Sequence, residues 1–265
     1  MLTFLRKIRR SLIDSGSTGK YLMYALGEVL LVVLGILIAL QINNWNEERK
    51  TKQTLAIYLN NLKENIESDI IAFKQKHESS IFRYYATQYL IRLAGHKPYD
   101  PSKDEHTVPN WKSNRIWKGP IPEQYHKEFI EKAFLWTHRV AINDLNRSTV
   151  EELKSTGMYS KLDKKLKDAL RNYHNNWEFR FGKFSQEGNR TIIVDWQASL
   201  HKEGTSNSNP FLIENPIRLL EKDPEKIAFL RLMAGSASWW AMSADILIEE
   251  ANDLMLQIDE QLQLN

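Results

Sequence analysis

The sequence predicts an all-α protein, in which an N-terminal transmembrane helix precedes an antiparallel bundle of roughly four helices with one long proline-rich loop. The first observation is an uninterrupted apolar run at residues 29–40. The second is that apolar residues farther along recur at spacings of three and four, the period of a helix with one buried face. The third is that strand-like alternation occurs only in TIIVDW, residues 191–196, which is too isolated to build a sheet.

The apolar segment extends from Tyr21 to Ile42 and is long enough to cross a membrane. As a helix its 22 residues measure about 33 Å, against about 30 Å for the hydrocarbon core of a bilayer. Tyr21 and Tyr24 lie at one end and Trp45 just beyond the other, so we expect these rings to anchor the helix in membrane lipid at the two interfaces. A cleaved signal peptide is the alternative. No small-x-small cleavage site follows the run, which favours a retained anchor.

The excess of basic residues is confined to the segment before the span. Residues 1–20 contain five basic residues and one acidic residue, whereas the remaining 245 residues contain 31 basic and 32 acidic ones. Five basic residues before the span against three soon after it predict a cytoplasmic N-terminus in the inner membrane. Residues 1–20 would be a cytoplasmic stub, and residues 43–265 a helical extracytoplasmic domain, periplasmic in a Gram-negative cell. The near-neutral charge of that domain argues against a nucleic-acid partner.

The first predicted helix of this domain covers residues 55–93, where leucine, isoleucine and aromatic residues form one apolar face. Gly95 is a reasonable C-terminal signal for this helix. Residues 96–122 contain five of the eight prolines and predict a long surface loop. A shorter helix is expected from about residue 123 to residue 141.

A capping signal predicts where the next helix starts. Ser148 and Thr149 each precede a glutamate by three residues, and both tetrapeptides fit a capping box. The short helix that they open is expected to end at Gly157.

Two further helices complete the predicted bundle. An apolar stripe beginning near residue 161 is expected to continue as far as residue 200. GTSNSNP, residues 204–210, predicts a break in the helical structure. Asp223, followed by Pro224, fits an N-cap with proline at the first helical position and predicts the start of the last helix.

The N-terminal segment resembles a known family. Residues 4–50, FLRKIRRSLIDSGSTGKYLMYALGEVLLVVLGILIALQINNWNEERK, resemble the N-terminal signature of a large uncharacterised family of single-pass membrane proteins from Gram-negative bacteria. Residues 148–174, STVEELKSTGMYSKLDKKLKDALRNYH, are similar to a threonine-glutamate-leucine-serine-glycine segment of that family. The resemblance implies an inner-membrane anchor and a helical extracytoplasmic domain of unknown function. It implies no activity.

Motifs for catalysis and metal binding are mostly absent from the sequence. The chain has no cysteine, which excludes disulfides, thiolate metal sites and a cysteine nucleophile. It has no HExxH, P-loop, GxGxxG or GxSxG motif. Its one Glu-x-x-His, from Glu123 to His126, is half of what a di-iron bundle requires. His138, Asp144 and Ser148 are close in sequence, but that is no evidence for a triad. We therefore expect no enzyme, no cofactor and no metal site.

Apart from Trp45 at the end of the predicted span, the other seven tryptophans lie farther along the chain. Most such residues fill a core or dock a loop on a bundle, because their rings are large and mainly apolar. The alternative is that some of them line a surface for a ligand or partner. Trp111 and Trp117, in the proline-rich loop, are the two candidates for such a surface.

Glu28 stands about 10 Å inside the predicted span, directly before the apolar run. A charged acid at mid-membrane costs at least about 2.5–3.5 kcal/mol. On a helix Glu28 shares a face with Leu31, Gly35 and Ala39, and the Gly35-x-x-x-Ala39 pair lets two helices approach closely. We therefore predict that these four residues form a helix–helix contact, with Glu28 protonated or hydrogen-bonded. The other helix would belong to a homo-oligomer or to a membrane partner. The alternative is a boundary acid that water hydrates.

Two functional classes follow from these observations. The first is a membrane-anchored helical interaction or scaffolding protein with no catalytic activity. The alternative is a ligand-sensing bundle that signals through a membrane partner. A sensor usually needs a cytoplasmic output, and only about 20 residues are expected on that side, which favours the first class.

Overall fold

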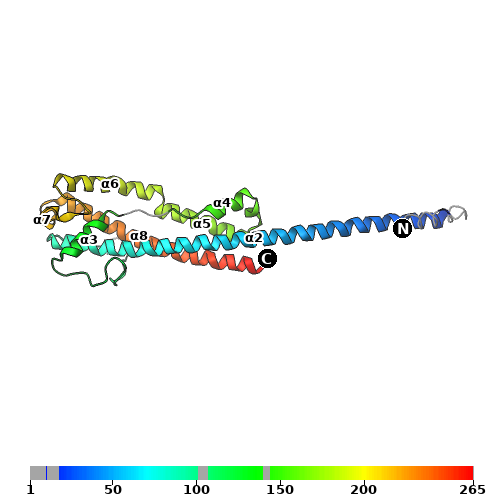
Figure 1. Ribbon diagram of the computed structural model, residues 1–265, viewed down its shortest axis with the longest axis horizontal. Coiled ribbons are helices and arrows are strands. Elements are labelled where there is room, and N and C mark those ends of the chain that lie inside the picture. The colour runs from blue at the N-terminus through cyan, green and yellow to red at the C-terminus, as the bar shows by residue number, and fades with distance from the viewer. Residues whose placement is uncertain (1–9, 11–17, 101–106, 140–143, 265) are drawn as a thin grey trace. The chain divides into compact units, whose positions relative to one another are not determined.

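The computed structural model describes residue 10 and residues 18–100, 107–139 and 144–264 (Figure 1). Within these ranges the regular structure consists of α-helices and short 3₁₀ helices, with no strand, which confirms the all-α prediction. The strand-like stretch at residues 191–196 lies inside a helix. The chain forms two compact units, residues 1–57 and residues 58–265, and each is described separately.

Helix α2 covers Thr18–Leu93 without interruption. The apolar segment and the first amphipathic face, separate patterns in the sequence, therefore belong to one helix. No glycine or proline lies between residues 43 and 54. Ion pairs one turn apart also support the helix there, since Lys50 lies 3.3 Å from Glu47 and Lys52 lies 3.8 Å from Glu48. Helix α2 ends as predicted, with Gly95 just beyond it at φ 74°, a conformation that favours glycine.

The second unit contains the C-terminal part of α2 and all later helices. Their bounds are α3 Lys127–Thr137, α4 Ser148–Ser155, α5 Lys164–Phe181, α6 Lys183–Lys202, α7 Ile217–Lys222 and α8 Pro224–Leu264, with short 3₁₀ helices η2 Met158–Lys161 and η3 Pro210–Leu212. Helix α8 contacts α5, α6 and α7, and α5 contacts α6.

Polar contacts between helices define the direction in which α8 runs. Lys63 of α2 donates to Asp259 at 2.6 Å, and His77, farther along α2, lies 3.2 Å from Asp245. Numbering rises along α2 as it falls along α8, so the two helices are antiparallel. The C-terminal helix therefore returns along α2, as the bundle prediction requires (Figure 1).

Helix α5 is also antiparallel to α8. Lys165 pairs with Glu260 at 2.7 Å, and Asn176 donates to Glu250 at 2.6 Å. Helices α2 and α5 consequently run in the same direction, as the first and third helices of an alternating four-helix bundle do. The short α3, α4 and their connections make the return between them.

The break between α5 and α6 falls at Gly182, within the stretch from residue 161 to residue 200 that was expected to be continuous. The Gly182 N–H donates to the Glu178 carbonyl at 2.9 Å, and its carbonyl accepts from Gln186 in α6. A Cβ at residue 182 would lie 2.2 Å from the Glu178 carbonyl oxygen. The apolar stripe continues across the break, which is why periodicity alone did not show it.

The capping prediction at Ser148 and Thr149 is wrong. Arg147 is the N-cap of α4 and makes no side-chain cap, so Ser148 is the first helical residue. The Ser148 hydroxyl donates instead to the Asn146 side chain at 2.8 Å, and Thr149 accepts from Asn65 of α2 at 2.7 Å. Tertiary and loop partners have replaced the local cap.

The predicted cap of the last helix is correct. The Asp223 carboxylate accepts from the backbone N–H groups of Glu225 at 2.9 Å and Lys226 at 3.2 Å. It also accepts from the buried Lys226 ammonium. Gly157, at φ 75°, follows α4 as predicted.

Candidate functional site

The apolar segment of α2, residues 22–42, is the first candidate site. Among the residues that the structure describes, only this helix is long and apolar enough to cross a membrane. Its large apolar side chains are exposed, from 47% at Val33 to 80% at Met23. The segment is compatible with a single-pass membrane anchor, although the helical core of a soluble protein can have the same length and composition.

The structure places all four predicted contact residues of this segment in helical conformation. Glu28, Leu31, Gly35 and Ala39 are exposed, and nothing lies within 4 Å of a Cβ built on Gly35. The helix–helix contact therefore stays a prediction. Of the predicted anchors, Trp45 is exposed and Tyr24 half-buried, while the Tyr21 side chain lies outside the described residues.

The two tryptophans of the proline-rich loop pack on the bundle. Trp111 contacts Phe82 of α2, with ring centroids 6.0 Å apart, and Trp117 contacts Phe129 of α3 at 5.0 Å. Their indole N–H groups donate to carbonyls of the same loop, at Gly119 and Pro120. These contacts show a structural role in docking the loop. A surface for a ligand or partner at Trp111 and Trp117 stays a prediction.

The histidine of the single Glu-x-x-His motif has a structural role. His126 is the N-cap of α3, and its Nδ1 atom accepts from the Phe129 N–H at 3.2 Å. Sequence reasoning noted the motif without anticipating a histidine cap. No group of three or more histidine, aspartate or glutamate side chains placed to hold a metal occurs in the described ranges.

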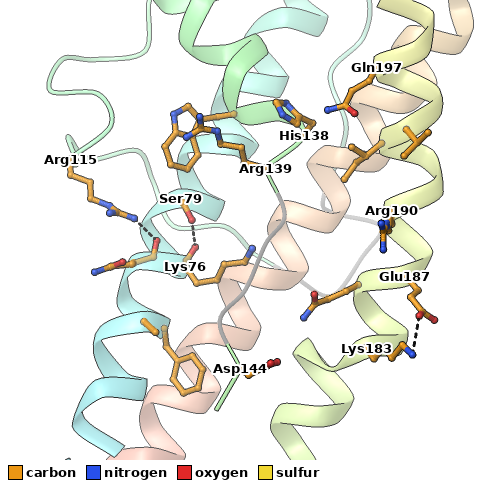
Figure 2. A pocket seen from close by; sticks show the side chains of 17 residues that line it. Lys76, Ser79, Arg115, His138, Arg139, Asp144, Lys183, Glu187, Arg190 and Gln197 are labelled. Atoms are coloured by element: carbon orange, nitrogen blue, oxygen red, sulfur yellow. Dashed lines mark hydrogen bonds and ion pairs between the residues drawn. The ribbon is translucent and has the colours of Figure 1, made fainter. Parts of the chain in front are cut away.

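A cavity of about 1020 Å³ in the second unit is the second candidate site (Figure 2). Its lining comes from α2, the proline-rich loop, the C-terminal end of α3 and the residues after it, Asp144 before α4, and α6. Five basic residues line it: Lys76, Arg115, Arg139, Lys183 and Arg190. Among the described residues, two acidic ones do so, Asp144 and Glu187. Formal charge in the cavity is therefore positive, although the domain as a whole is close to neutral.

Lys76 is the most deeply buried of these cations, with 7% of its surface exposed. Its ammonium lies 3.6 Å from the centroid of the Trp240 ring, and the guanidinium of Arg83 lies 4.8 Å from the same centroid. Burial, together with the nearby positive charge of Arg83, lowers the pKa of Lys76 well below its usual value. Burial also lowers the pKa of Arg83, to about 9.

His138 follows α3 and faces the same cavity. Its Nδ1 atom is buried and has no hydrogen-bond partner among the described residues. Burial lowers the pKa of His138, so the imidazole is neutral near pH 7. Asp144 also lines the cavity, but Ser148 does not, and its hydroxyl contacts Asn146. The three residues considered as a triad are therefore not brought together here.

Sequence reasoning missed this cavity because its charged residues come from segments far apart in the chain. The sequence did contain one indication of a buried polar site. Lys76 and Arg83 are seven residues apart, and both lie among the buried residues of α2. Two cations in the apolar stripe of an amphipathic helix are unusual and indicate a built polar site.

Comparison with known proteins adds a match to a family model. Residues 28–81 match a family described as a family of unknown function (DUF6090). That stretch contains most of the apolar segment and the following part of α2. No curated protein and no solved structure matches the chain.

Proposed function

We propose that this protein is a membrane-anchored helical interaction protein without catalytic activity. In this proposal the apolar segment of α2 crosses the inner membrane once, residues 1–20 are cytoplasmic, and the helical unit is extracytoplasmic. The supporting observation is the exposure of every leucine, isoleucine, valine and methionine side chain from Leu22 to Ile42. A core helix of a soluble protein would bury such a stripe, since each side chain gains about 1.5–3 kcal/mol on leaving water.

The membrane topology can be tested with two single-cysteine variants, because the native chain has no cysteine. Ser17→Cys and Ser208→Cys would be treated in intact spheroplasts with an impermeant maleimide, and Ser208 is exposed in the structure. We expect labelling at residue 208 and not at residue 17. The reverse pattern would invert the orientation, and labelling of both before lysis would contradict a single span.

Within the membrane, we propose that α2 pairs with a second helix through Glu28, Leu31, Gly35 and Ala39. The exposed backbone at Gly35 permits close approach, and a partner helix would offset the cost of placing Glu28 in hydrocarbon. The second helix comes from another copy of the chain or from a membrane partner.

A membrane two-hybrid reporter of self-association tests this contact. Glu28→Gln should largely preserve pairing, whereas Glu28→Leu and Gly35→Ile should each weaken it. Val33→Ile adds a methylene group on the opposite side of the helix and serves as the control. Unchanged association in both disruptive variants would refute the contact. If the wild type shows no self-association, the same variants would be tested by affinity capture from the membrane, and the amount of co-purifying membrane protein would be measured.

The ligand-sensing alternative is favoured by one observation, the positively charged cavity in the extracytoplasmic unit. A protein that binds partners only through its outer surface does not require a charged internal cavity. It provides a place where a small molecule could alter the bundle, and hence the helix that enters the membrane.

A further inference from the structure

We propose that the cavity between α2, α3 and α6 binds a small organic anion, in which a phosphate or carboxylate group is attached to an apolar body. This inference deepens the ligand-sensing candidate and rests on it for its biological purpose. The binding chemistry is argued from the cavity alone and is independent of pairing in the membrane.

Two of the lining guanidinium groups have no acidic partner in the described part of the chain. Lys183 lies 3.6 Å from Glu187, and Arg115 lies 3.3 Å from Glu78, so those two cations are neutralised locally. Arg139 and Arg190 form no ion pair with any carboxylate in the described part of the chain. They come from different elements and both line the cavity (Figure 2). Guanidinium groups bind phosphate and carboxylate through paired N–H donors, so an oxyanion is the ligand group that this arrangement favours.

Lys76 is a buried cation at the cavity wall. Lys76 and Arg83 approach the same indole of Trp240, so their mutual repulsion adds to the cost of burying each one. An anion in the cavity would offset part of that cost, because Coulomb interactions are strong where water is partly excluded.

The rest of the lining suits the apolar body of such a ligand. Phe73, Trp136 and Ile193 contribute apolar surface to the lining, beside the charged groups. His138 adds a buried Nδ1 atom with no partner among the described residues, which could bond a ligand hydroxyl or amide. A volume of about 1020 Å³ is at the upper end for small-molecule sites, so an inorganic ion alone would fill little of it.

A small molecule fits better than an acidic segment of a partner protein. The Lys76 side chain is almost fully buried, and a ligand group must enter the cavity to reach it. A partner surface would meet the exposed Lys183 and Arg190 first and would leave the buried end of the cavity unused.

The test is isothermal titration of the full chain in mild detergent with three probes: phenyl phosphate, inorganic phosphate and phenol. We expect phenyl phosphate to bind at least about tenfold more tightly than inorganic phosphate, since its ring adds apolar contact, and phenol to show no binding. Arg139→Gln and Arg190→Gln should each weaken phenyl phosphate binding about tenfold, and the double variant more.

Arg171→Gln is the matched control, because Arg171 is an exposed arginine of α5 that pairs with Asp168 outside the cavity. The Arg171→Gln variant should bind phenyl phosphate with the affinity of the wild type. Absence of phenyl phosphate binding, or equal binding by the double variant, would overturn the proposal. Equal affinity for phosphate and phenyl phosphate would overturn its organic part. Glu28→Leu should bind phenyl phosphate normally, which separates failure of this inference from failure of membrane-helix pairing.

Discussion

Replacing Asp69 by asparagine should stabilise the helical unit at neutral pH. Asp69 lies on α2 with 6% of its surface exposed. Its carboxylate accepts from the Asn146 N–H and from the Tyr173 hydroxyl, each at 3.2 Å. These two bonds favour the charged form, but burial outweighs them and raises the pKa of Asp69 from 3.8 to about 6.

The sign of the pH effect follows from this raised pKa. Between about pH 4 and 6 the folded protein holds the Asp69 proton while the unfolded chain has lost it. The free energy of unfolding therefore falls as the pH rises through this window, and the loss is complete above it. A rise from 3.8 to about 6 corresponds to about 3 kcal/mol.

The amide introduced by Asp69→Asn would remain neutral at every pH and could still accept from Asn146 while donating to the Tyr173 oxygen. We expect Asp69→Asn to raise the free energy of unfolding by about 1–2 kcal/mol at pH 7.5. This is less than the value that corresponds to the pKa shift, because amide hydrogen bonds are weaker and nearby solvent screens the carboxylate. The gain should shrink steadily as the pH falls from 7.5 to 4 and should vanish only below the unfolded pKa of 3.8, where the aspartate is protonated in both states.

The assay is urea unfolding of the full chain in mild detergent, followed by tryptophan fluorescence at pH 4, 5, 6 and 7.5. Glu67→Gln, an exposed acid on the same helix, is the control and should show no comparable pH-dependent difference. A difference between Asp69→Asn and wild type that does not change with pH, or an asparagine variant that is less stable at pH 7.5, would refute the reasoning.

Three further predictions concern the helical unit. Gly182→Ala should lower the free energy of unfolding by about 1–3 kcal/mol, because its Cβ would meet a carbonyl oxygen at 2.2 Å. Gly188→Ala, with open space around the added Cβ, should be neutral or stabilising by up to about 1 kcal/mol, and equal losses in both variants would exclude the steric explanation. Asp223→Ala should lower the free energy of unfolding in urea by at least about 1–2 kcal/mol, because the N-cap of α8 is lost. Asp223→Asn should retain the cap and lose only the ion pair with Lys226. Equal losses in the two variants would assign the whole effect to the ion pair. Trp111→Ala should speed trypsin cleavage within residues 107–122, since the loop would lose its contact with the bundle, and an unchanged cleavage rate would show that other contacts hold the loop.

Local signals in the sequence were reliable where a helix end is decided by neighbouring residues. Gly95, Gly157 and Asp223 mark helix ends as expected, because left-handed backbone and side-chain caps involve only a few consecutive residues. The capping boxes at Ser148 and Thr149 failed because Asn65 and Asn146 compete for the same hydroxyl groups. A side chain caps its own helix only where no other hydrogen-bond partner in the fold binds that side chain first.

The sequence by itself determined that this protein is helical and that residues 22–42 form an apolar helical segment, because hydrophobic period and run length are properties of consecutive residues. Only the tertiary structure decided that α5 ends at Gly182 and that Lys76 shares Trp240 with Arg83. It also brought Arg139 and Arg190 to one cavity from segments about 50 residues apart. Charge and burial at such a site depend on distances across the fold, and helical periodicity contains no information about them.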